Sequence, residues 1–274
     1  MSPRLVPVVL MLASAAAAAD ELPSVASINL CADQLVLSIA DPAQIRTVSW
    51  LAADPHESML DAEARRYPLN YGSAEEIIEF APDVVVAGIF TSAFTRALLR
   101  DLGYTVVDLA PEDSIADIER NIEIVAAALR RAERAAVVIG EMRAHVAALA
   151  ATRRPELATA VVVRPGGFTV GAHTLADELM NLAGLRNVVA ESGLDRWGSL
   201  SMETLLRSTP ALLIQTGYRR EQPSLANLVL EHAALTGLTT TTATVTVPAK
   251  YWSCGLPASL YSVEMLQAAR RELP

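Results

Sequence analysis

Seven aromatic side chains of this chain fall at the ends of predicted strands or in loops: Trp50, Tyr71, Phe168, Trp197, Tyr218, Tyr251 and Trp252. They include all three tryptophans, in a chain with only 5% aromatic residues. Any one of these rings could serve ordinary loop packing. As a set outside the strand interiors, they favour a cleft that holds a large, flat, partly apolar ligand by stacking and burial.

Polar side chains that could recognise the edges of such a ligand stand in the same segments. Asn29 follows the first predicted strand, Arg164 follows the first strand of the second half, and Arg196 lies in the segment DRWGS. A few polar groups in an apolar cleft fix the orientation of a ligand. These residue types predict non-covalent recognition.

The two cysteines, Cys31 and Cys254, lie near opposite ends of the chain. Cys31 follows the first predicted strand at or near a helix N-terminus, where a thiolate is stabilised. Cys254 lies in the last strand-end loop. Three alternatives stay open: contact with the ligand, a disulfide between the lobes in an oxidising compartment, or two buried reduced thiols.

Sequence signatures of catalysis are missing. The chain contains no GxxxxGK[ST], no GxGxxG opening a helix, no GxSxG and no HExxH motif. Its histidines show no spacing typical of a metal site: His56, His145, His173 and His232. We therefore expect no catalytic residue, no metal ligand and no prosthetic group.

One segment occurs twice. SAEEIIEFAPDVVVAG and SMETLLRSTPALLIQTG each read as a capped helix, a proline and a buried strand. Three pairs of residues share a spacing of 128 positions: Ser73 and Ser201, Glu75 and Glu203, Pro82 and Pro210. An acid in the first helical turn stabilises a helix by about 0.3–1 kcal/mol, and helix–proline–strand units are common, so coincidence is the alternative. The equal spacing favours two related lobes.

Buried strands alternate with helices in both halves of the chain. The strand candidates are VASINL, IRTVSW, DVVVAG and TVVDLA, then TAVVVRP, NVVAE, LLIQTG and TTTTATVTVP. Apolar runs separated by helical segments predict parallel sheets covered on both faces. Ligands bind such sheets beyond the carboxyl ends of the strands, where the aromatic residues lie.

Between the halves, residues 114–151 contain no proline and a single glycine, and apolar residues recur every three or four positions. This period predicts one helix about 55 Å long, too long for one small domain. The predicted fold is therefore α/β, with two doubly wound parallel-sheet lobes at residues 20–113 and 153–274. One long α-helix at 114–152 joins them, and the ligand cleft lies between them.

The N-terminus and the net charge restrict the location and the partners. One arginine, an apolar run and a series of small residues have the build of a secretory signal peptide over residues 1–19. A membrane anchor is the alternative, but the apolar run is short. The net charge is −9 and no basic cluster occurs, which argues against nucleic acid as a partner. A periplasmic protein without membrane insertion follows.

Several segments together resemble the periplasmic binding proteins of iron–siderophore and cobalamin ABC importers. They are the signal segment, RTVSWLAADP, EEIIEFAPDVVVAG, the long helix, GGFTVGAHTLADELMNLAGLRNVV and RWGSLSMETLLRSTPALLI. The resemblance covers nearly the whole chain after the signal segment. It implies two α/β lobes bridged by one helix with little hinge motion, a metal chelate in the cleft, and delivery to a membrane permease.

The resemblance also implies roles for individual residues. One glutamate on each lobe pairs with arginines of the permease dimer, and these correspond to Glu75 and Glu203. Trp197 matches a tryptophan that contacts the ligand in cobalamin-binding members. The expected ligand-binding residues are Asn29, Cys31, Trp50, Leu51, Tyr71, Gly72, Phe168, Trp197, Tyr218, Tyr251 and Trp252.

The ligand itself stays open at this point. A cysteine after the first strand is not typical of cobalamin binders, and no lone tyrosine or arginine cluster indicates haem or an acidic siderophore. We expect a monomeric binding subunit for a cobalt corrinoid or a ferric siderophore, with haem or free zinc or manganese as alternatives in the same fold. Two rivals from other classes are an extracytoplasmic α/β enzyme, which needs a nucleophile or metal triad, and a partner-sensing lobe, which predicts a shallow polar cleft.

Overall fold

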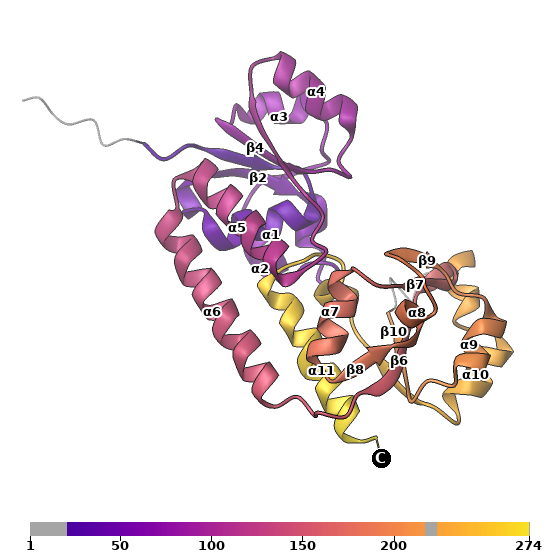
Figure 1. Ribbon diagram of the computed structural model, residues 1–274. Helices are drawn as coiled ribbons and strands as arrows, with labels where there is room; N and C mark the ends of the chain where they lie inside the picture. The colour runs from indigo at the N-terminus through magenta and orange to yellow at the C-terminus, as the bar shows by residue number, and fades with distance from the viewer. Residues whose placement is uncertain (1–20, 217–223, 274) are drawn as a thin grey trace, which may run out of the picture.

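The computed structural model of the chain describes residues 21–216 and 224–273, and it confirms the predicted fold class (Figure 1). The N-terminal lobe contains a parallel sheet with the strand order β3-β2-β1-β4-β5. Its strands are β1 (Val25–Ser27), β2 (Ile45–Ser49), β3 (Leu69–Asn70), β4 (Val84–Gly88) and β5 (Thr105–Leu109). The predicted signal peptide, residues 1–19, lies outside the described residues.

Helices cover both faces of this sheet, as its apolar strands require. They are α1 (Leu30–Ile39), α2 (Asp61–Ala64), α3 (Ala74–Phe80), α4 (Ala93–Asp101) and α5 (Ile115–Leu129). Successive residues of a strand point to opposite faces. In β4, Val84 and Val86 therefore join the core formed with α1 and α5, and Val85 joins the core formed with α3 and α4.

The C-terminal lobe contains a second parallel sheet, with the order β11-β10-β6-β8, and a small antiparallel pair, β7-β9. Its strands are β6 (Ala158–Val163), β7 (Phe168–Val170), β8 (Leu185–Asn187), β9 (Trp197–Ser199), β10 (Leu212–Gln215) and β11 (Ala243–Thr246). Its helices are α7 (Leu175–Leu182), α8 (Val188–Glu191), α9 (Met202–Ser208), α10 (Ala233–Thr239) and α11 (Leu260–Arg271). The candidate strand NVVAE is wrong in part, because the chain turns helical at Val188, where Asn187 caps α8.

Short 3₁₀ helices complete the two lobes: η1 (Pro42–Gln44), η2 (Trp50–Ala53), η3 (Pro165–Gly167), η4 (Leu225–Val229), η5 (Ala249–Tyr251) and η6 (Pro257–Ser259). Over residues 21–216 and 224–273, none of the helices has the length and apolar character needed to cross a membrane.

The prediction of one continuous helix over residues 114–152 is wrong. Two helices occupy this range, α5 and α6 (Ala132–Ala151), and the break lies at Arg130, which adopts a left-handed conformation (φ 55°). The N–H of Arg131 bonds back to the carbonyl of Ala126 at 2.8 Å, as in a common helix ending. Because the residues at the break are arginines and not glycine or proline, the sequence offers no stop signal there.

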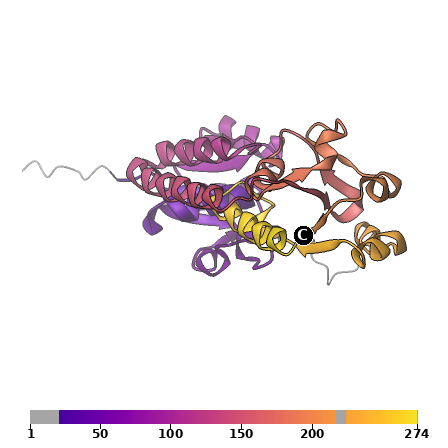
Figure 2. The same cartoon turned by 60° about the horizontal axis from the view of Figure 1, so that its bottom comes forward.

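The bridge between the lobes is therefore α6 alone, about 30 Å long. Near its start, Arg134 donates to the carbonyl of Ser38 in α1 of the N-terminal lobe (2.9 Å). Near its end, the carbonyl of Leu149 accepts from Gln267 in α11 of the C-terminal lobe (2.8 Å). Helix α11 packs beside α6 (Figure 2), and one continuous apolar core runs through both lobes along these helices.

The repeated segment has the same structure in both lobes. Helices α3 and α9 are each seven residues long, 128 positions apart, and each ends in a left-handed residue before a proline: Ala81 and Thr209. Ser73 and Ser201 both cap their helices by accepting a backbone N–H three residues on. Read as β8-β6-β10-β11, the second sheet also matches β2-β1-β4-β5 of the first. The two lobes are built on one plan.

A disulfide joins the lobes. Cys31, near the start of α1, is bonded to Cys254, in the loop before η6, with their Cα atoms 5.3 Å apart. Of the three alternatives for the cysteines, the structure shows the disulfide. A free Cys31 thiolate and a pair of reduced thiols are thereby excluded, and contact of Cys31 with the ligand stays a prediction.

We expect the double substitution Cys31→Ser and Cys254→Ser to lower the free energy of unfolding by roughly 2–4 kcal/mol, because the bond restricts the unfolded chain over 223 residues of separation. Urea unfolding followed by circular dichroism measures this. Wild-type protein in reductant serves as the control and should match the variant, which itself should not respond to reductant. Equal stability of variant and oxidised wild type would contradict the expectation.

Candidate ligand-binding cleft

The carboxyl ends of the two parallel sheets provide the candidate site. In the first sheet β1 lies between β2 and β4, and in the second β6 lies between β8 and β10. The connections on the two sides of each of these central strands therefore run in opposite directions across the sheet. Such switch points are where open α/β sheets bind ligands. Asn29 follows β1 and Arg164 follows β6, and both line one cavity between the lobes.

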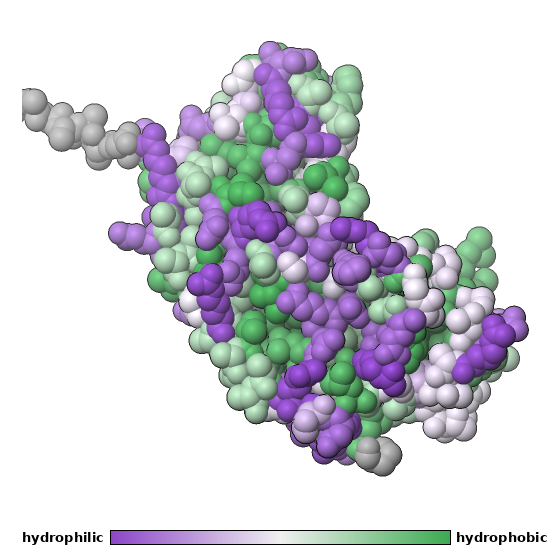
Figure 3. Space-filling view, viewed as in Figure 1, coloured by the Kyte–Doolittle hydropathy of each residue, from purple (hydrophilic) through white to green (hydrophobic). Residues whose placement is uncertain are grey.

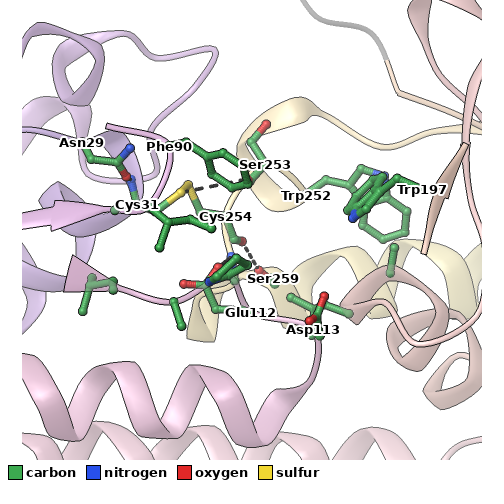
Figure 4. Close-up of a pocket in the computed structure, with 18 of the residues that line it drawn as sticks. Asn29, Cys31, Phe90, Glu112, Asp113, Trp197, Trp252, Ser253, Cys254 and Ser259 are labelled. Carbon is green, nitrogen blue, oxygen red and sulfur yellow. Dashed lines mark hydrogen bonds between the residues drawn. A yellow bond between two sulfur atoms is a disulfide. The ribbon is translucent and has the colours of Figure 1, made fainter. Parts of the chain in front are cut away.

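This cavity has a volume of about 210 Å³ and is lined from both lobes (Figure 4). In Figure 4 the disulfide and Phe90 lie toward one end, and Trp197 and Trp252 lie toward the other. The molecule is hollowed between the lobe that carries α3 and α4 and the lobe that carries β7 and β9 (Figure 3). Pockets for drug-sized ligands measure about 300–1,000 Å³, so this cavity has room for one end of a large ligand.

Five of the predicted ligand-binding residues line this cavity: Asn29, Cys31, Trp197, Tyr251 and Trp252. Trp197 is half exposed (51%), so its ring is available for stacking. Asn29 is partly fixed, because its side chain caps α1 by accepting the N–H of Cys31 (3.0 Å).

The other predicted residues lie outside the lining of this cavity: Trp50, Leu51, Tyr71, Gly72 and Phe168. Trp50 and Tyr71 stack on one another, with ring centroids 6.2 Å apart and an interplanar angle of 29°. They follow β2 and β3, at the same carboxyl edge as Asn29. Tyr218 falls outside the described residues.

Sequence reasoning missed several residues that line the cavity. Ile89 and Phe90 follow β4, and Glu112 and Asp113 follow β5. The signal was available, because all four lie within four residues after the end of a strand in a parallel sheet. Phe90 in GIFTS is an aromatic residue of the same kind as Phe168, and the acids of LAPEDS are polar groups at the same edge of the sheet.

Two acids on the N-terminal side of the cavity already have partners. Glu112 accepts from the side chain of Asn121 (2.6 Å) and from the backbone N–H of Gly255 (3.3 Å), and burial raises its pKa. Asp113 accepts from Arg196 at 2.7 Å, an ion pair between the lobes. A Cβ atom at Gly255 would come within 2.3 Å of the Cβ of Glu112, so only glycine allows this close approach.

The guanidinium of Arg164 lies against the ring of Trp197 in the C-terminal lobe. The guanidinium carbon is 4.9 Å from the ring centroid of Trp197, in cation–π geometry. Burial lowers the pKa of Arg164 to about 10, so the side chain stays charged at neutral pH. One end of the cavity is therefore both aromatic, from Trp197 and Trp252, and positively charged, from Arg164.

A buried carboxyl group positions the strand end that carries Trp50. Asp33 in α1 accepts from the backbone N–H of Ser49 (3.0 Å) and from its hydroxyl. Ser49 ends β2 and precedes Trp50. Burial raises the pKa of Asp33 from 3.8 to about 6, against the opposing effect of these hydrogen bonds.

Metal-binding groups are not gathered here. Within residues 21–216 and 224–273, no group of three or more His, Cys, Asp or Glu side chains is arranged to hold a metal ion. His173 is exposed and its Nδ1 lies 2.9 Å from Asp195.

The sequence model of the periplasmic binding protein family matches residues 25–244. No curated protein matches the chain.

Solved structures share the fold at low sequence identity. The periplasmic haem-binding protein HutB of Vibrio cholerae is 18% identical, with a TM-score of 0.75 over 90% of this chain and 98% of its own. The vitamin B12-binding protein BtuF of Vibrio cholerae is 17% identical, with a TM-score of 0.68 over 91% and 97%. A protein of an ABC-type Fe3+-hydroxamate transport system from Saccharomonospora viridis is 18% identical, with a TM-score of 0.68 over 91% and 93%.

The shifted pKa of Asp33 leads to a test by pH. Since the folded state holds this proton more tightly than the unfolded state, the contribution of Asp33 to stability is present below pH 4 and is lost as the pH rises through about 6. We expect the unfolding free energy of Asp33→Asn, measured relative to that of wild type, to increase by roughly 2–3 kcal/mol when the pH is raised from 4 to 7. Urea unfolding of both proteins at the two pH values measures this.

Asp83→Asn is the matched control for this test. Hydrogen bonds from Ser24 lower the pKa of Asp83, so its contribution is present at neutral pH and is lost as the pH falls. Because that loss occurs below the unfolded pKa of 3.8, the difference in unfolding free energy between this variant and wild type should stay nearly constant from pH 4 to pH 7. An Asp33→Asn difference that does not change with pH would contradict the assignment.

Proposed function

The chain belongs to the periplasmic binding protein family, which consists of binding proteins and not enzymes, and on that premise we propose that it is the substrate-binding subunit of an ABC importer. It captures a metal chelate, a cobalt corrinoid or a ferric siderophore, in the cleft between the lobes and delivers it to a membrane permease. The N-terminal segment directs export to the periplasm and is removed after residue 19.

The observation that carries this proposal is the facing arrangement of the two sheets. The switch points after β1 and β6 line one cavity, and its wall includes Trp197, Tyr251, Trp252 and Phe90. A metal chelate with a large apolar ring or arms gains affinity by covering such rings. This arrangement also weighs against a partner-sensing lobe, whose cleft would be shallow and polar.

Haem is the alternative ligand, and two observations favour it. Tyr71 is 76% exposed beside Trp50 at the same edge, and a phenolate is one of the side chains that ligate haem iron. The charged Arg164 at the opposite sheet suits a carboxylate.

A panel of chelates tests the ligand class. Cyanocobalamin, a ferric hydroxamate and iron(III) protoporphyrin IX are titrated into the protein, and tryptophan fluorescence is followed. We expect quenching with a Kd at or below about 1 μM for one class, because Trp197 and Trp252 line the cavity. Trp197→Ala should weaken that binding by about tenfold or more. No binding of any member at micromolar concentration would refute the proposed ligand class.

Docking on the permease is proposed to involve Glu75 and Glu203. Both side chains are exposed in the first turn of α3 and α9, the repeated helices of the two lobes. A two-fold permease dimer would meet one carboxylate from each lobe, and opposite charges steer such an encounter. Glu203 lies 3.4 Å from Arg207 on its own helix, a weak exposed pair that a stronger partner can replace.

We expect the double charge reversal Glu75→Arg and Glu203→Arg to abolish ligand uptake by permease-containing vesicles while the Kd for the ligand stays within about twofold. Glu79→Arg, one helical turn further along α3 and also exposed, is the matched control and should leave uptake unchanged. Uptake at the wild-type rate, or loss of ligand affinity in the double variant, would contradict the docking role. The two glutamates would then serve only to stabilise their helices.

A further inference from the structure

The disulfide between the lobes lies in the wall of the cleft cavity. Cys31 and Cys254 both line this cavity, and Figure 4 shows their bond toward the end that also carries Phe90. Cys254 is buried, whereas Cys31 is partly exposed. Disulfides that are exposed to an incoming thiol are the labile or regulatory ones. This bond can therefore be reached from the place where the ligand binds.

One end of the bond lies on a segment of the cleft wall. Trp252 and Cys254 both belong to residues 249–259, which include η5 and η6. The disulfide ties this segment to the start of α1 in the N-terminal lobe, and the N–H of Gly255 donates to Glu112 of the same lobe at 3.3 Å. The position of Trp252 relative to the N-terminal lobe therefore depends on the disulfide.

The same segment borders open space on its other side. Leu256, Pro257 and Ala258 line a second cavity of about 440 Å³, whose other walls include α1, α6 and α11. Close packing holds a core in place, but a segment that lies between two cavities can shift into either one. The disulfide restrains a part of the cleft wall that packing leaves room to move.

The two lobes stay connected when the disulfide is broken. Helix α6 keeps its hydrogen bonds to α1 through Arg134 and to α11 through Leu149, and the continuous apolar core runs along these helices. Reduction then loosens the wall that carries Trp252 and leaves the fold intact. Binding to a preorganised wall is tighter than binding to a wall that the ligand must first order.

We propose that the Cys31–Cys254 disulfide is a redox switch of the cleft. The oxidised protein holds the transported chelate tightly, and reduction by a dithiol loosens the wall and lowers the affinity. The proposal rests on the proposed function, because the ligand that the switch controls is the chelate in the cleft. It goes beyond that function by making retention of the ligand depend on the thiol–disulfide state of the surroundings.

The reduction is an ordinary thiol–disulfide exchange with a dithiol. A thiolate of the dithiol attacks the accessible sulfur of Cys31, the bond to Cys254 breaks, and Cys254 leaves as a thiolate that takes up a proton. The second thiol of the reductant then attacks its own partner sulfur in the mixed disulfide and releases Cys31. Two electrons pass to the protein, which gains two thiols, and the reductant becomes a disulfide.

Ligand binding and the redox state must affect one another equally. If oxidation raises the affinity for the chelate by a given factor, the chelate shifts the equilibrium toward the disulfide by the same factor. A ligand in the cavity also covers Cys31, which lines it. The loaded protein should therefore be reduced more slowly by dithiothreitol than the empty protein.

Three forms of the protein test the effect on affinity: oxidised wild type, wild type reduced with dithiothreitol and desalted without air, and Cys31→Ser/Cys254→Ser. Each is titrated with cyanocobalamin, a ferric hydroxamate and iron(III) protoporphyrin IX in buffer without reductant, which would also reduce the metal. We expect the chelate that binds oxidised wild type to bind the other two forms about fivefold or more weakly, as is typical of coupled sites. Reoxidation of the reduced wild type should restore its Kd.

The possible results separate the switch from the proposed function. One chelate binding all three forms with equal Kd would overturn the switch and leave the proposed function standing. Absence of binding in every form would refute the proposed function, and with it the ligand that the switch controls.

Hydrogen exchange tests the structural part of the switch without any ligand. At labelling times too short for global unfolding, we expect reduction to speed exchange at residues 249–259 by about tenfold or more, because local opening becomes easier. Helix α6 should keep its protection. The double variant is the control and should show the reduced pattern with or without dithiothreitol. Unchanged exchange at residues 249–259, or equal acceleration in α6, would show that the bond serves stability alone, and the proposal would fail.

Discussion

The facing position of the two sheets depends on how tightly the lobes are joined at the base of the cleft. Helix α6 contacts α1 at one end and α11 at the other, and the Cys31–Cys254 disulfide ties the start of α1 to the loop before η6. The same apolar core passes through both lobes. Because packed cores resist gradual deformation, the strand ends keep their spacing, and the cavity exists before any ligand arrives.

This fixed frame explains how the cleft tolerates unfavourable groups. Within residues 21–216 and 224–273, Nε and Nη2 of Arg164 are buried without a hydrogen-bond partner, and such a group persists only where the surroundings leave it no other conformation. Here Trp197 covers the guanidinium, and the pair of Arg196 with Asp113 ties the two lobes beside it. The close contact of Gly255 with Glu112 holds the loop that carries Trp252. The contacts around the cavity thus hold the charged side chain of Arg164 in place within it.

The sequence predicted those elements of the fold that depend on residues close together in the chain. The apolar run of β4 and the capped helices α3 and α9 follow from residues that are neighbours in sequence, and so does their repetition. The break at Arg130 carries no glycine or proline, so the sequence does not mark it. The turn into helix at Val188 follows from Asn187, a preferred N-cap residue inside an apolar run that resembles a strand. The pairing of β7 with β9 and the disulfide each join segments far apart in the chain. In the cleft, the strand-end rule located Asn29, and the family resemblance located Trp197, which begins β9. Only the fold could reveal that Nε and Nη2 of Arg164 have no acceptor among the described residues.

The common plan of the two lobes links ligand capture to delivery. In each lobe a helix that precedes a central strand starts at the carboxyl edge of the sheet, the edge that also carries the cleft residues. The first turns of α3 and α9, with Glu75 and Glu203, therefore belong to the same side of the molecule as the cleft. Under the proposed docking, a two-fold permease that pairs with both glutamates sits across the cleft mouth. Release then requires disturbance of the few contacts at the strand ends, and the disulfide and α6 can stay in place throughout.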